Sequence, residues 1–149
     1  MTAARAPLSL DEGVAGVEIG PVGVDLILGL AVAGIVLAGA EAAFFHGRTR
    51  FFHPAMFVPP AYALLALWLG SWHLADPEAP LPREALYYLL GVGVLVGLAG
   101  ETFHLRRAAR ALRSTPKGRY RTLSVGAPLS LPLLFLLFGL MGIVAFHLP

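Results

Sequence analysis

Four long apolar blocks constrain what this chain can fold into. They lie at about residues 22–45, 57–74, 84–105 and 124–148, and each is long enough for a helix to cross the ~30 Å hydrocarbon core of a bilayer. Only 13% of the 149 residues are charged, whereas a soluble domain carries about 25%. The sequence therefore predicts an all-α integral membrane protein: a single domain of four transmembrane helices, arranged as two tandem helical hairpins in one bundle.

Charged residues are divided between the two sides of this predicted bundle. The connections after the first and third blocks, "HGRTRFFHP" and "RRAARALRSTPKGRYR", contain nine of the eleven Lys and Arg residues and no acid. The tail 1–20 and the loop 75–84 hold most of the acids. Because positive charge marks the cytoplasmic side, we expect the basic loops to be cytoplasmic and both termini to be extracytoplasmic. The acidic tail has no apolar core, so we do not expect a signal peptide.

Prolines lie near the block boundaries. The second and fourth blocks begin with prolines, and Pro132 falls in the first turns of the fourth, where a missing N–H needs no partner. Pro77, Pro80 and Pro82 precede the third block. Since proline disfavours helical geometry in the residue before it, these three predict an extended loop.

The blocks repeat in pairs. The first ends in "LAGAEAAFFH" and the third in "LAGETFHLRR", while the second and fourth end in "WHLADP" and "FHLP". The corresponding pairs are Glu41 with Glu101, His73 with His147 and, more loosely, His46 with His104. Either an ancestral duplication or the Ala/Leu/Gly-rich composition accounts for this similarity.

Small residues predict which helices meet at the centre. Gly34 and Ala38 in the first block, and Gly93 and Gly97 in the third, are spaced as small-xxx-small pairs. Such residues let helix backbones approach closely in lipid. We therefore expect the first and third helices to cross at the centre and the second and fourth to flank them.

The acid and histidine positions follow the small residues by one heptad. Glu41 lies seven residues after Gly34, and His104 lies seven after Gly97, with Glu101 on the same flank. Positions seven apart on a helix are nearly in line, and a carboxylate facing lipid is costly. We expect a buried Glu/His cluster near the cytoplasmic side. The alternative is that both glutamates simply pair with arginines of the basic loops.

A metal site is one interpretation of this cluster. Glu101 and His104 have the i, i+3 spacing of ligands in di-iron bundles, but the motif occurs once, so a complete di-iron site is not expected. A single transition metal held by Glu41, Glu101 and His104, with His46 or His53, is the remaining metal hypothesis.

A b-type haem is a second interpretation. His46, His53 and His104 lie at the predicted inner end, and His73 and His147 at the outer end, so histidines could ligate haem at two depths. The chain has no cysteine, which excludes Fe–S clusters and covalent c-type haem. Asp25 lies about 160° around the helix from Glu41; it either compensates the helix dipole or forms an outer cation-entry site.

The basic stretch after the third block contains Arg106, Arg107, Arg110 and Arg113. It is expected to continue the third helix past the membrane, against anionic lipid headgroups, or only to set the topology. The expected partners are the lipid bilayer and either further copies of the chain or a larger membrane complex. Nucleic-acid binding is not expected, because the basic residues sit beside a bilayer.

Three functional hypotheses follow. The first is a metal- or haem-binding module or subunit in membrane redox or proton chemistry, including a quinone-associated subunit. The second is a small cation or proton transporter or channel subunit that uses Glu41 and Glu101. The third is a non-catalytic membrane scaffold or assembly partner. The sequence contains no Gly-rich phosphate loop and no Ser–His–acid arrangement, so it assigns no catalytic residues.

Overall fold

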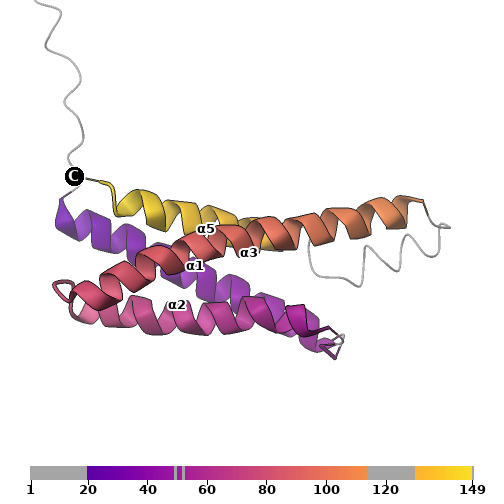
Figure 1. Cartoon of the computed structure of the whole chain (residues 1–149), viewed down its shortest axis with the longest axis horizontal. Coiled ribbons are helices and arrows are strands. Elements are labelled where there is room, and N and C mark those ends of the chain that lie inside the picture. Colours follow the sequence, from indigo (N-terminus) through magenta and orange to yellow (C-terminus); the bar gives the residue numbers. More distant parts are fainter. Residues whose placement is uncertain (1–19, 49, 52, 114–129, 149) are drawn as a thin grey trace, which may run out of the picture.

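The computed structural model describes residues 20–48, 50–51, 53–113 and 130–148, and these residues form a helical bundle without strands. Figure 1 shows the helices side by side along the long axis of the molecule. The elements are α1 (Pro21–Arg48), the short 3-10 helix η1 (Pro54–Phe57), α2 (Val58–Ala75), α3 (Pro80–Leu112) and α5 (Leu131–Ala145). The prediction of an all-α fold is confirmed.

Three stretches are long and apolar enough to cross a membrane: α1, η1 together with α2, and α3. α5 has 15 residues, which corresponds to about 22 Å. The predicted fourth span began at residue 124, and residues 124–129 lie outside the described part of the chain. Large apolar side chains point outward from the described helices, as a lipid-facing surface requires; examples are Leu37, Leu64 and Leu95.

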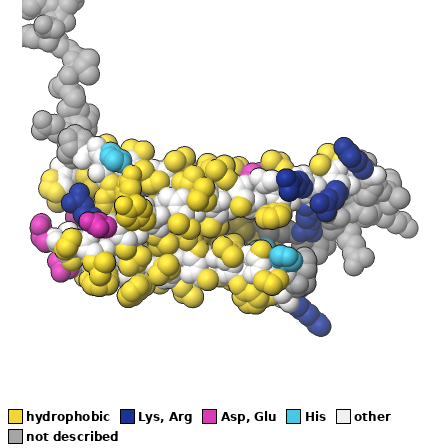
Figure 2. Space-filling view, in the orientation of Figure 1, with side chains coloured by type: hydrophobic (Ala, Val, Ile, Leu, Met, Phe, Trp, Pro, Cys, Tyr) yellow, Lys and Arg dark blue, Asp and Glu magenta, His cyan; other side chains and the backbone are white. Residues whose placement is uncertain are grey.

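Figure 2 shows that hydrophobic side chains cover the middle of the bundle on this face and that charged side chains lie mainly at its two ends. We call one end the arginine-rich end; it carries Arg48, Arg50, Arg106, Arg107, Arg110 and Arg113. The opposite end, with the α2–α3 connection, is the acidic end; it carries Asp76, Glu78 and Glu84.

Proline lies at the start of each helix, where it has no hydrogen bond to break. α3 begins at Pro80, earlier than the predicted start at residue 84. The prediction that Pro80 and Pro82 keep this segment extended is therefore wrong, because both fall within the first turn, where proline is tolerated. Ala79, the residue before Pro80, is extended. α3 also continues to Leu112, as expected for the basic stretch.

The helices pack as a ring. α1 packs against α2 and α5, and α3 packs against α5 and α2. Within the described residues, α1 and α3 are diagonal to each other and share no close backbone contact. The prediction that these two helices cross at the centre is therefore wrong. Their glycines receive neighbouring helices instead: Gly34 faces Phe138 of α5, and Gly93 faces Tyr62 of α2.

The interior is mostly apolar. The largest fully buried side chains include Leu28 and Ile35 of α1, Leu86 and Leu90 of α3, and Phe135 of α5. Ala38 is also buried and belongs to the same core. Burial of such side chains between helices contributes packing energy rather than a hydrophobic drive in lipid.

Candidate functional site

Glu101 lies on α3 beside the first turn of α5. A Cβ on Gly97 would stand 2.8 Å from the carbonyl oxygen of Pro132 and 2.7 Å from the backbone nitrogen of Leu136. A Cβ on Gly100 would lie 3.0 Å from Pro132 Cβ. α3 and α5 are therefore in close backbone contact immediately before Glu101. Its Oε2 atom is buried and has no hydrogen-bond partner, an arrangement that is costly for an ionised carboxylate.

His104 follows Glu101 by almost one helical turn and is half-buried. It interacts electrostatically with Glu101 and with Arg107. His46, on the diagonal helix α1, is also half-buried and lies within electrostatic range of His104. We call these three side chains the Glu101–His104–His46 cluster. Two helices that share no close backbone contact therefore carry side chains that interact electrostatically at the arginine-rich end.

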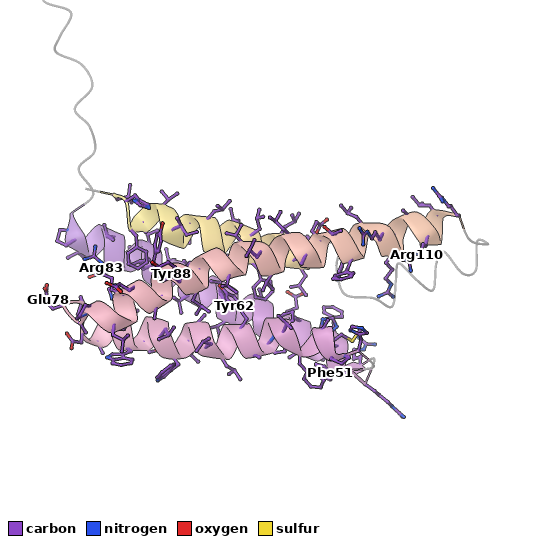
Figure 3. The ribbon with its side chains drawn as sticks, in the orientation of Figure 1. Phe51, Tyr62, Glu78, Arg83, Tyr88 and Arg110 are labelled. Atoms are coloured by element: carbon purple, nitrogen blue, oxygen red, sulfur yellow. The ribbon has the colours of Figure 1, made fainter. Side chains whose placement is uncertain are left out.

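The turn after α1 holds His46 in place. Arg50 and Phe51 have positive φ angles of 59° and 43°, which reverses the chain. The Phe51 backbone nitrogen donates to the His46 carbonyl oxygen at 3.0 Å. The Phe51 ring lies edge-on to His46, with centroids 6.1 Å apart, and stacks on Phe57 at 4.4 Å. Figure 3 shows Phe51 at this end of the bundle.

Glu41 does not join the cluster. It is exposed, so the prediction that it faces a helix–helix contact is wrong. The buried stripe of α1 runs through Ile35, Ala38 and Ala42. One more helical step of four residues leads to His46, whereas Glu41 lies about 100° from Ala42. The repeat therefore preserves the glutamate in sequence but not its environment.

The ligand set proposed for a metal is not assembled. His53 is exposed, and its Nδ1 accepts a hydrogen bond from the Ala55 backbone nitrogen at 3.2 Å, which caps η1. Among the described residues, which include all five histidines, no group of three or more His, Asp or Glu side chains could hold a metal ion. The cluster offers interacting pairs rather than a coordination sphere.

The two histidines at the acidic end are also separated. His73 is buried, with 4% of its surface exposed, whereas His147 is exposed and its Nε2 lies 3.4 Å from the Tyr87 hydroxyl. Between their rings lie those of Phe146 and Tyr87, with successive centroid distances of 5.9, 5.7 and 5.8 Å. His73 and His147 therefore do not face each other as axial ligands of one haem would.

The arginines predicted to contact lipid headgroups lie beyond the cluster. Arg106, Arg107 and Arg110 belong to the last turns of α3, Arg113 follows them, and all four are exposed. Figure 3 shows Arg110 on the part of α3 that extends past the other helices. This projecting segment has the charge needed to contact anionic headgroups.

No family model, characterised protein or solved structure shows significant similarity to this chain. Sequence reasoning missed Tyr62, whose hydroxyl donates to the Leu89 carbonyl oxygen at 3.2 Å in the interior. A tyrosine within an apolar block is the signal that could have revealed it, since a buried phenol needs a partner.

Proposed function

We propose that this protein is an integral membrane protein that binds and transfers protons at its arginine-rich end, through Glu101, His104 and His46. The observation that carries the proposal is the buried, unpartnered Oε2 of Glu101 beside His104. An ionisable side chain inside a membrane bundle is expensive and usually functional. A carboxyl group and two imidazoles are also the side chains that most readily exchange protons near neutral pH.

The proposed membrane topology has four spans in two hairpins. The first hairpin consists of α1 and α2, and the second of α3 and α5. The concentration of arginines at one end supports a cytoplasmic location for that end, with both termini outside the cytoplasm. In this orientation, the Glu101–His104–His46 cluster lies near the cytoplasmic surface.

The proposed chemistry is a short proton relay. A proton on the Glu101 carboxyl group passes to a neutral His104, and His104⁺ passes a proton on to neutral His46. The electrostatic interactions of Glu101 with His104 and of His104 with His46 support this order. Proton transfer is the part shared by the redox-module and transporter hypotheses, whereas metal and haem ligation gain no support from the ligand positions.

Proteoliposomes that contain a trapped pH-sensitive dye test the proposal. We expect wild-type protein to move protons down a pH gradient, with valinomycin and potassium present to remove the opposing potential. Glu101→Gln should lower the flux at least tenfold because the amide cannot bind and release a proton. Glu41→Gln is the matched control: it makes the same substitution at the corresponding position of the repeat, where the side chain is exposed.

Infrared spectroscopy supplies a readout that does not require flux. The wild-type protein should show a carboxyl C=O band that disappears in Glu101→Gln and persists in Glu41→Gln. Absence of wild-type proton flux together with absence of such a band would contradict the proposal. So would equal losses in the two variants. Stoichiometric metal that is lost in His104→Gln would replace proton transfer with metal binding.

A further inference from the structure

A second polar site lies at the acidic end, away from the cluster. There a pocket of about 260 Å³ forms between the start of α1, the end of α2, the start of α3 and the end of α5. Asp25, His73 and Arg83 supply its charged and polar groups, and its apolar wall includes Leu28, Phe146 and Leu148. Each of α1, α2, α3 and α5 therefore contributes at least one residue to the lining of this pocket.

His73 is the strongest indication that the pocket is built for a ligand. His73 lines the pocket, and only 4% of its surface is exposed. Its Nδ1 atom is buried and has no hydrogen-bond partner. A buried polar atom without a hydrogen-bond partner destabilises the folded protein. A ligand that reached this imidazole would remove that cost.

Two charges of opposite sign accompany His73. Asp25 and Arg83 both interact electrostatically with it. The Arg83 guanidinium carbon lies 6.0 Å from the centroid of the Phe146 ring, which in turn lies 5.9 Å from the His73 ring. Figure 3 shows Arg83 at this end of the bundle. The pocket therefore combines one anionic acceptor, one cationic donor and one imidazole that can act as either.

This charge pattern disfavours a ligand that carries a charge of only one sign. A carboxylate or phosphate would meet Asp25, and an ammonium group would meet Arg83. A neutral hydroxyl can donate to Asp25 and accept from Arg83 or His73. The volume is below the usual 300–1,000 Å³ of drug-sized ligand sites, so it suits a head group rather than a whole lipid. The pocket also lies at the end of an apolar bundle, where an attached chain can reach lipid.

We propose that this pocket binds the neutral, hydroxyl-bearing head group of a membrane lipid, by hydrogen bonds to Asp25, His73 and Arg83. Two sources share this chemistry: the ring of a quinol and the glycerol head of a monoacylglycerol. The proposal uses none of Glu101, His104 and His46, so it stands or fails separately from proton transfer at the other end.

Native mass spectrometry of the full chain, released from phosphatidylcholine nanodiscs, tests the proposal. The probes are a decyl-substituted benzoquinol, monodecanoylglycerol, decanoate and decylamine. We expect a saturable one-to-one adduct with a neutral hydroxylated probe and at least tenfold weaker binding of decanoate and decylamine. An adduct with the quinol alone identifies a redox lipid as the source, and one with the monoacylglycerol alone identifies a glyceride.

Three variants locate the binding site. Asp25→Asn and His73→Phe should each weaken the adduct at least tenfold. Glu84→Gln should leave it unchanged, because Glu84 is an exposed acid on the same end of α3 that does not line the pocket. Thermal unfolding without ligand shows whether His73→Phe still folds, and Asp25→Asn preserves the side-chain shape in any case.

Three results would overturn the proposal. The first is no saturable adduct with either neutral probe. The second is preferential binding of decanoate or decylamine, which would show that the pocket selects an ion. The third is equal weakening by Glu84→Gln and Asp25→Asn, which would show that the lipid responds to the general charge of this end rather than to the pocket.

Discussion

The Tyr62 hydroxyl occupies the space that a side chain on residue 93 would fill. A Cβ built on Gly93 would overlap the Tyr62 hydroxyl oxygen and lie 2.8 Å from its Cζ atom. From this position the hydroxyl donates to the Leu89 carbonyl oxygen at 3.2 Å, and the ring lies edge-on to Phe135 at 5.8 Å. Glycine at residue 93 therefore lets one phenol connect α2, α3 and α5.

Gly93→Ala is expected to destabilise the bundle by about 1–3 kcal/mol, the usual cost of overpacking a filled interior. The added methyl group displaces Tyr62 and with it the contact between α2 and α3. SDS-induced unfolding in mixed micelles measures the change in the free energy of unfolding. Gly91→Ala is the control, since a Cβ there meets nothing within 4 Å. Equal stabilities of the two variants would show that the Tyr62 ring is not held against Gly93.

Tyr62→Phe is expected to lower the free energy of unfolding by about 1 kcal/mol, the typical value for one hydrogen bond in a membrane interior. The Leu89 carbonyl group keeps its helical partner but loses the phenol. Tyr88→Phe, on the exposed face of α3, removes a hydroxyl without this contact and should be neutral. In the Gly93→Ala background, Tyr62→Phe should lower the free energy of unfolding by less than it does alone, because it also removes the hydroxyl oxygen that the new methyl group overlaps. If the effects of the two substitutions simply add in the double variant, this coupling is contradicted.

The sequence predicted the helices well because their length and apolar content are local properties. It did not predict which helices are neighbours. Small residues indicate that another helix packs closely against them, but they do not show which helix it is. Gly97 receives the α5 backbone and Gly39 receives Ala63 of α2, although both glycines belong to the helices that we expected to pair with each other. The choice of partner depends on the large side chains opposite, such as Phe138 and Tyr62.

The sequence predicted only part of the candidate site, because a pattern along one helix does not show which side chains of other helices lie beside it. Glu101 and His104 follow directly from helical spacing on one element. Glu41 was included by analogy with its repeat, and a difference of about 100° in helix phase from the buried stripe leaves it exposed. The approach of His46 to His104 involves two helices and an irregular turn at Arg50 and Phe51, which no single-helix pattern contains.

Phe51→Ala is expected to lower proton flux several-fold by releasing His46. The Phe51 ring contacts the His46 ring, and the Phe51 backbone nitrogen donates to the His46 carbonyl oxygen. The backbone hydrogen bond can persist in the variant, but the ring stack on Phe57 is lost. The proteoliposome assay measures the effect. Phe44→Ala serves as a control because Phe44 is an exposed ring near the same end of α1. A normal flux in Phe51→Ala would show that this turn does not position the relay.

Cysteine cross-linking tests the ring arrangement directly, since the chain has no native cysteine. A Cβ on Gly29 would lie 3.9 Å from Leu74 Cδ1, so a short bifunctional thiol reagent should cross-link the pair Gly29→Cys and Leu74→Cys. The pair Gly29→Cys and Leu81→Cys should not be cross-linked, because α1 and α3 are diagonal. Gel mobility reports the products. Preferential cross-linking of the second pair would restore α1 and α3 as neighbours.

Single cysteines at the two ends test the membrane topology. Arg50 and Glu78 are both exposed and lie in connections at the arginine-rich and acidic ends. In intact cells, an impermeant maleimide should label Glu78→Cys readily and Arg50→Cys only after the membrane is opened, because the arginine-rich end is proposed to be cytoplasmic. The reverse pattern would show that the proposed orientation is inverted. If both cysteines were labelled from the same side, the η1–α2 segment between residues 50 and 78 would not cross the membrane, contrary to the proposed span.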